Sequence, residues 1–173
     1  MFDQDNLTEN DWKYLIQAFV PEGALLEIVV ADLNEHDWDL FFKVLIKQFK
    51  TIEINFIGDK SNLESKDYTF EKFRKYFEGP EGGLTTFLVA SGDLRLHLTI
   101  YELDRAELVL NPYDVRSKDS ILILLHLMAG LASSLKRTVL LKLDGYRNSI
   151  FELDSAGKLI IYPENMPDPL ANS

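Results

Sequence analysis

The sequence predicts an α+β fold, with a mixed or mainly antiparallel sheet and about four helices packed on it. Two observations lead to this class. The first half of the 173-residue chain alternates helical apolar periodicity with strand-like apolar runs. The second half is dominated by short strands separated by brief turns. Because of these meanders, we do not expect a fold built from alternating βαβ units along the whole chain.

The expected helices are marked by caps and by the spacing of their apolar residues. Thr8 precedes an acid by three residues, which is a capping pair, and Asn34 is a suitable cap for the next helix. The last helix is apolar around most of its circumference, which indicates burial against more than one neighbour. The four expected helices cover residues 9–20, 35–49, 70–77 and 117–135.

The expected strands show apolar residues at every second position or short apolar runs between turn residues. In the clearest strand, four aliphatic residues from Leu94 to Ile100 alternate with other residues, so we expect them on one face. Residues 1–163 are predicted to form one domain and residues 164–173 a proline-rich flexible tail. The eight expected strands cover residues 25–31, 52–56, 84–90, 94–101, 106–110, 139–143, 149–153 and 159–162.

The composition excludes several kinds of chemistry. The chain has no cysteine, which excludes thiolate catalysis, zinc knuckles, iron–sulfur clusters and disulfides. A formal net charge of -10 opposes binding to nucleic acid or to an anionic membrane, so neither is an expected partner. Acidic residues stand near the amino terminus where a secretory signal would carry basic ones, which favours a cytoplasmic protein. The apolar run 121–132 is too short to span a bilayer.

The acidic residues are concentrated in the first third of the chain. Residues 1–59 carry twelve acidic and four basic residues, a net charge of -8, whereas the remaining 114 residues carry a net charge of -2. A concentrated negative surface attracts a basic protein, and salt weakens that attraction. The alternative is that these acids cap helices and keep the protein in solution. The predicted partner-binding residues come from the densest patch: Asp32, Glu35, His36, Asp37 and Asp39.

The same acidic patch matches no metal-binding signature, so no metal and no cofactor is expected. Three histidines are available for acid–base chemistry. His126 interrupts an apolar helix and is expected to be buried and structural. Arg95, His97 and Tyr101 share one strand face and form an alternative ligand site. No nucleophile elbow, paired-carboxylate signature or metal motif accompanies them.

The leading hypothesis is therefore a non-enzymatic acidic protein-binding module. Its most concrete form is a bacterial toxin-neutralising, immunity-type protein that occludes a basic partner such as a toxin. This class follows by analogy from small size, acidity and the lack of a catalytic signature. One alternative is a small-ligand-binding or hydrolytic enzyme that uses the strand face around His97. Another is a structural or regulatory oligomer subunit with aromatic helices at its interface, because the sequence leaves the oligomeric state open.

Overall fold

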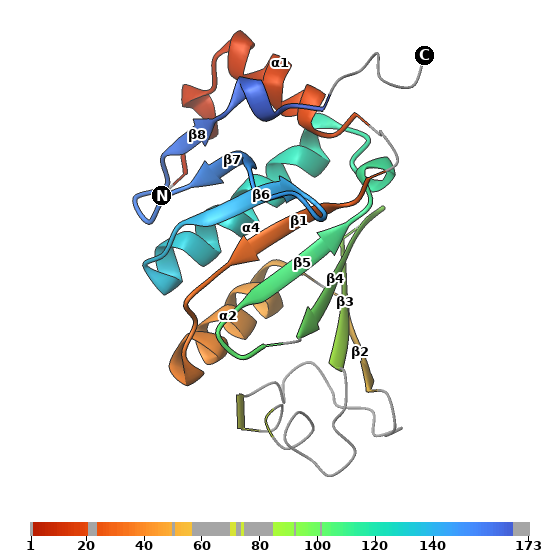
Figure 1. Ribbon diagram of the computed structural model, residues 1–173, viewed down its shortest axis with the longest axis vertical. Helices are drawn as coiled ribbons and strands as arrows, with labels where there is room; N and C mark the ends of the chain where they lie inside the picture. Colours follow the sequence, from red (N-terminus) through yellow and green to blue (C-terminus); the bar gives the residue numbers. More distant parts are fainter. Residues whose placement is uncertain are drawn as a thin grey trace.

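The computed structural model describes residues 2–20, 24–49, 51–56, 70, 71, 74, 85–91, 93–100 and 102–167, without the side chains of residues 51–56, 85–91 and 99. Figure 1 shows one twisted sheet with helices behind it. Within the described residues there are three α-helices, fewer than the four expected, and the α+β class is confirmed. The expected helix at 70–77 falls largely outside these residues. The helices are α1 (Glu9–Ala18), α2 (Glu35–Gln48) and α4 (Lys118–Leu135).

The sheet has eight strands in the order β2-β3-β4-β5-β1-β6-β7-β8. Every neighbouring pair is antiparallel, so the sheet consists of two meanders with β1 inserted between them. The strands are β1 (Leu26–Val30), β2 (Thr51–Phe56), β3 (Thr85–Ser91), β4 (Leu94–Ile100), β5 (Ala106–Leu110), β6 (Val139–Leu143), β7 (Ser149–Leu153) and β8 (Leu159–Ile161).

Local sequence explains where the helices begin. Thr8 and Asp11 form a complete capping box at α1, and Asn34 and Asp37 form another at α2. At α4, the Ser117 side chain accepts a hydrogen bond from the Ser120 backbone N–H. These caps satisfy backbone N–H groups that have no partner inside the helix.

The helices cover one face of the sheet and build the core there. The aliphatic residues of β4 from Leu94 to Ile100 that were expected on one face are all buried in this core. Helix α4 packs against α2 and against β6 and β7, as its apolar circumference predicted. The two helices cross closely at Gly130, where a Cβ atom would lie 3.2 Å from Val44 Cγ1. By length and composition α4 is the one helix of the described residues that could cross a membrane, but 50% of it is buried within this protein.

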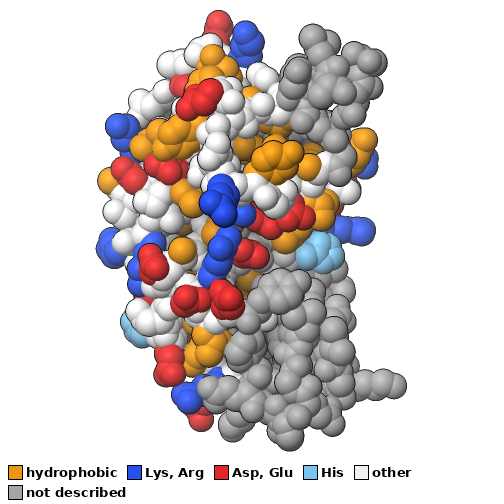
Figure 2. Space-filling view, viewed as in Figure 1, with side chains coloured by type: hydrophobic (Ala, Val, Ile, Leu, Met, Phe, Trp, Pro, Cys, Tyr) orange, Lys and Arg blue, Asp and Glu red, His pale blue; other side chains and the backbone are white. Residues whose placement is uncertain are grey.

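The other side of the sheet, which we call the open face, carries polar side chains. Arg95 and His97 of β4 are exposed there, because they alternate with the buried leucines. The register places His97 opposite Val109 of β5, Val109 opposite Glu27 of β1, and Glu27 opposite Lys142 of β6. Figure 2 shows basic side chains near the middle of this face, flanked by acidic ones.

The carboxyl-terminal segment begins with packed residues. The short helix η4 (Pro163–Asn165) follows β8, and Asn165 Nδ2 donates to the Ser149 carbonyl at 2.8 Å. Gln17 Nε2 of α1 donates to the Pro167 carbonyl at 3.1 Å. Of the tail expected over 164–173, residues 164–167 therefore lie against the domain, and residues 168–173 are outside the described part.

Candidate functional site

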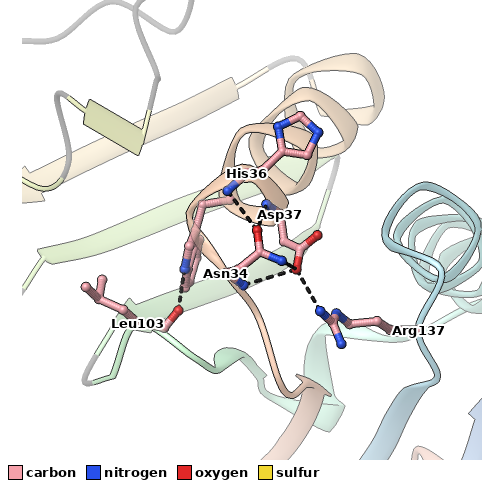
Figure 3. A network of polar contacts seen from close by, with 6 residues as sticks. Asn34, His36, Asp37, Leu103 and Arg137 are labelled. Atoms are coloured by element: carbon pink, nitrogen blue, oxygen red, sulfur yellow. Dashed lines mark hydrogen bonds and ion pairs between the residues drawn. The ribbon is translucent and has the colours of Figure 1, made fainter.

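The acidic patch around the start of α2 is built on an internal polar network (Figure 3). Asn34 Oδ1 accepts hydrogen bonds from the backbone N–H groups of His36 at 2.9 Å and Asp37 at 3.2 Å. Asp37 Oδ2 in turn accepts from the Asn34 backbone N–H at 3.0 Å and from Asn34 Nδ2 at 2.7 Å. Arg137, which follows α4, donates to the same Asp37 oxygen at 2.8 Å. With 7% exposure, Asp37 fixes the structure of the patch and does not face solvent.

Trp38 ties the patch to a distant loop. Its side chain is fully buried, with 0% exposure, and its Nε1–H donates to the Leu103 carbonyl at 2.6 Å. Before α2 begins, the Leu33 backbone N–H donates to the Asp104 carbonyl at 2.7 Å. These two bonds hold the β1–α2 connection against the β4–β5 connection. The two connections lie at the lower left of Figure 1.

The meeting of these two connections produces a surface that we call the acidic corner, made of Asp32, Glu35, Glu102 and Asp104. All four residues are exposed. Glu35 pairs with Arg74 at 3.1 Å, but both side chains are largely exposed and such a pair is weak in water. The other three carboxylates make no ion pair with any residue of the described part. The acidic corner therefore keeps most of its negative charge available to a partner.

The five residues singled out from the sequence have different environments. Asp32, Glu35 and His36 are exposed, whereas Asp37 points inward. Asp39 is half-buried, and one of its oxygens accepts a hydrogen bond from the Phe70 backbone N–H at 2.8 Å. Sequence reasoning missed Glu102 and Asp104, which lie 63 to 72 residues further along the chain than residues 32–39, because only the pairing of β1 with β5 brings them to the patch.

The remaining acids of the amino-terminal segment lie elsewhere. Asp3 and Asp11 line a hollow of about 340 Å³ beside the β7–β8 turn, together with Phe2, Leu7 and Lys158. Both carboxylates are engaged locally, Asp3 with the Asp5 N–H and Asp11 with Thr8. The acidic residues of the first third thus lie in at least two separate groups, and only Asp32 and Glu35 of them belong to the acidic corner.

The alternative site on the open face is only partly described. Arg95 and His97 are exposed side by side along β4, whereas Tyr101 lies outside the described residues. His126, expected to be buried, is exposed. Its ring meets the Phe2 ring edge-on, with the two ring centroids 5.7 Å apart. That expectation was wrong because His126 occupies the outer side of α4, where the apolar circumference is interrupted. No group of three or more metal-ligating side chains occurs within the described residues.

Charged residues that the sequence did not single out meet at the centre of the open face. Lys142 Nζ lies 2.6 Å from Glu27 Oε2, and both side chains are largely buried. Burial raises the pKa of Glu27, the Lys142 ammonium opposes this rise, and a hydrogen bond with Asp144 adds to it. Arg105 and Glu107 form a second pair at 2.6 Å. Within each pair the opposite charges compensate each other, which makes both pairs a structural feature of the sheet.

The raised pKa of Glu27 has a consequence for stability. A carboxyl group with a raised folded-state pKa stabilises the fold below its unfolded pKa and loses that contribution as pH rises through the folded pKa. For Glu27→Gln we therefore expect the stability advantage of the wild type over the variant to shrink between mildly acidic and neutral pH. Urea unfolding of both proteins across this range measures it. The exposed Glu71→Gln is the control, and an advantage that grows with pH would contradict the expectation.

Comparison of this chain with protein-family models, with curated proteins and with solved structures finds no match.

Proposed function

We propose that this protein is a non-enzymatic binding module whose acidic corner docks a cationic protein surface. The observation that carries the proposal is the joining of two distant loops by the Leu33–Asp104 and Trp38–Leu103 hydrogen bonds. It brings Asp32, Glu102 and Asp104 to one surface without ion-pair partners in the described part of the chain.

The support beneath the acidic corner suits it to binding. Asp37 and Arg137 fix the start of α2, and Trp38 anchors both loops to the core, so little ordering is needed when a partner arrives. Opposite charges accelerate the encounter and orient the partner. Exposed carboxylates also favour arginine, whose guanidinium group makes paired hydrogen bonds to them.

The most specific form of the proposal is a cytoplasmic, toxin-neutralising protein of the immunity type. A toxin that acts on nucleic acid must carry lysines and arginines in its cleft, because these residues neutralise phosphates. The acidic corner would contact those cations and block the cleft. The chain's net charge of -10 supports long-range attraction to such a partner.

The test is charge reversal at the acidic corner. Basic nucleases and the product of the neighbouring gene are screened for binding by calorimetry and for inhibition. We expect the combined variant Asp32→Lys, Glu102→Lys, Asp104→Lys to weaken the interaction by about 100-fold or more, since each exposed pair contributes up to about 1 kcal/mol and repulsion replaces attraction. Added salt should weaken wild-type binding in the same direction.

The matched control reverses three exposed acids outside the acidic corner, with the variant Asp5→Lys, Glu9→Lys, Glu164→Lys. This variant has the same net charge as the corner variant and should lose much less affinity. Equal losses in the two variants would mean that only total charge matters. Affinity that neither salt nor the corner variant changes would refute the proposal.

A further inference from the structure

The turn between β6 and β7 contains an aspartate followed by a glycine. Asp144–Gly145 is the one Asp–Gly pair in the sequence. The Tyr146 N–H donates to the Leu143 carbonyl at 3.0 Å, which closes a β-turn, and Gly145 has a φ of 77° in the third position of that turn. Glycine adopts this φ without strain, as in a type II turn. The carboxyl carbon of an aspartate is one five-membered ring away from the next backbone nitrogen, so the local structure decides whether the two react.

The Gly145 nitrogen is accessible. Its N–H makes no hydrogen bond with the residues that the structure describes, and no heavy atom beyond the chain neighbours lies within 4 Å of the position that a Cβ atom would take. Residues 144–148 are all exposed. Ring closure requires rotation about the Asp144 Cα–C bond, which needs only local opening of this exposed turn. The Asp144 N–H bond to the Leu25 carbonyl, at 2.9 Å, precedes the rotating bond and can persist.

The Asp144 carboxyl group also has a suitable environment. Its hydrogen bond is with the Glu27 carboxyl group, and such a bond requires a proton between the two groups. The other charged groups at this pair are the Lys142 ammonium, 2.6 Å from Glu27 Oε2, and the Glu107 carboxylate. A protonated carboxyl group can lose an oxygen as water, whereas a carboxylate cannot. The contact with Glu27 therefore favours the form of Asp144 that reacts.

Two other aspartates precede a small residue, serine, and local hydrogen bonds restrain both pairs. Ser120, which follows Asp119 in the first turn of α4, donates its N–H to the capping serine at 3.1 Å. The Oδ1 atom of Asp154 accepts hydrogen bonds from the N–H groups two and four residues later, both at 2.9 Å. The nitrogen is thus engaged in the first pair and the carboxylate in the second. Asp144 and Gly145 have neither restraint.

We infer that Asp144 is a site of spontaneous modification, where aspartate converts to isoaspartate through a succinimide ring. The Gly145 nitrogen attacks Asp144 Cγ and forms an N–Cγ bond, while the proton of the nitrogen and the carboxyl OH leave together as water. Water then opens the ring at one of its two carbonyl carbons. Breaking the N–Cγ bond restores aspartate. Breaking the bond between the nitrogen and the Asp144 backbone carbonyl carbon gives isoaspartate, in which the chain runs through Cβ and Cγ.

The product changes the turn but not the charge. Isoaspartate lengthens the backbone by one carbon atom and keeps a single carboxylate. The Tyr146–Leu143 bond and the Lys142 Nζ bond to the Tyr146 carbonyl, at 3.2 Å, depend on the spacing that this atom alters. We therefore expect the isomerised protein to unfold at a lower urea concentration than fresh protein. The acidic corner lies at the other end of β1, so its binding of a cationic partner should not change, which keeps this inference separate from the proposed function.

The test measures isoaspartate in folded protein kept for several weeks in warm, neutral buffer. Peptide mapping with electron-transfer dissociation locates each isoaspartate, and an unchanged mass distinguishes it from deamidation of asparagine. We expect isoaspartate to form at residue 144 at least about 10-fold faster than at Asp119 or Asp154, which corresponds to a barrier about 1.4 kcal/mol lower. Asp144→Glu should abolish the signal, because glutamate would have to close a six-membered ring.

The matched control is Ser155→Gly, which places glycine after Asp154 in another exposed turn of the same chain. In the folded variant Asp154 should still react about 10-fold more slowly than Asp144, because its carboxylate stays bonded to the turn. In concentrated urea the two aspartates should react at similar rates. Equal rates in the folded variant would overturn the inference, since the Asp–Gly sequence alone would then account for the reaction. So would folded wild-type protein that forms no isoaspartate at residue 144.

Discussion

Replacing Trp38 by alanine is expected to lower the free energy of unfolding by about 3–5 kcal/mol, as for other large-to-small changes of buried aromatic residues. Trp38 is fully buried, and the centroid of its ring lies 5.4 Å from that of Phe41 and 5.8 Å from that of Phe42. The substitution leaves a cavity between these rings and removes the donor to the Leu103 carbonyl. Urea unfolding followed by circular dichroism measures the loss.

Trp12 provides the matched control. It is partly buried, and Lys118 lies over its ring at 4.8 Å. Trp12→Ala removes the same atoms from a less enclosed place and should cost clearly less than Trp38→Ala. Trp38→Phe keeps most of the packing but loses the hydrogen bond, so its cost should lie between zero and that of the alanine variant. Equal costs for the two alanine variants would contradict the role assigned to Trp38.

Asp37→Ala is expected to cost about 2–3 kcal/mol. The change removes half of the α2 capping box, which contributes about 1 kcal/mol, and it leaves Arg137 without its carboxylate in a largely enclosed place. The estimate is below the full value for breaking a buried pair because Arg137 is 28% exposed. Asp37→Asn should cost less, since it keeps an oxygen for the Asn34 backbone N–H.

Glu35→Ala is the control for this prediction, because Glu35 lies in the same helical turn and its partner Arg74 is also an arginine. That pair is exposed, so its loss should change stability by about 0.5 kcal/mol or less. A double-mutant cycle of Asp37→Ala with Arg137→Ala isolates the coupling between the two side chains. A coupling near zero would show that Asp37 acts through the helix cap alone.

Asp37 and Asp39 show why effects on stability must be separated from effects on binding at the acidic patch. In the sequence, Asp37 and Asp39 look as suitable for partner binding as Asp32. In the structure, Asp37 supports the acidic corner from within, and Asp39 bonds to the Phe70 backbone. Loss of binding in an Asp37 variant would therefore reflect a disturbed α2. Only the exposed acids report on the partner directly.

Features that depend on neighbouring residues could be predicted from the sequence. The caps at Thr8 and Asn34 are local, and both helices begin where those residues indicate. The alternation in β4 correctly separated buried leucines from Arg95 and His97. Such patterns reflect the 3.6- and 2-residue periods of helix and strand, which need no knowledge of the rest of the fold.

Features that depend on long-range pairing could not be predicted. Nothing near residue 26 indicates that β1 lies between β5 and β6, because backbone hydrogen bonds in a sheet do not depend on side-chain identity. The partner of Asp37 is 100 residues away in the chain, and Glu102 and Asp104 join the acidic corner only through the sheet.

The central place of β1 also affects how the protein forms during synthesis. This strand emerges early from the ribosome, but both strands that hydrogen-bond to it are made much later, the second only at residues 139–143. Until β5 is made both edges of β1 have no partner in the sheet, and the edge that pairs with β6 has none until residues 139–143 are made. Pairings over such long separations close slowly, and unpaired apolar strands are prone to aggregate. Nascent chains in which β6 has not yet been made should therefore depend on chaperones until translation is complete.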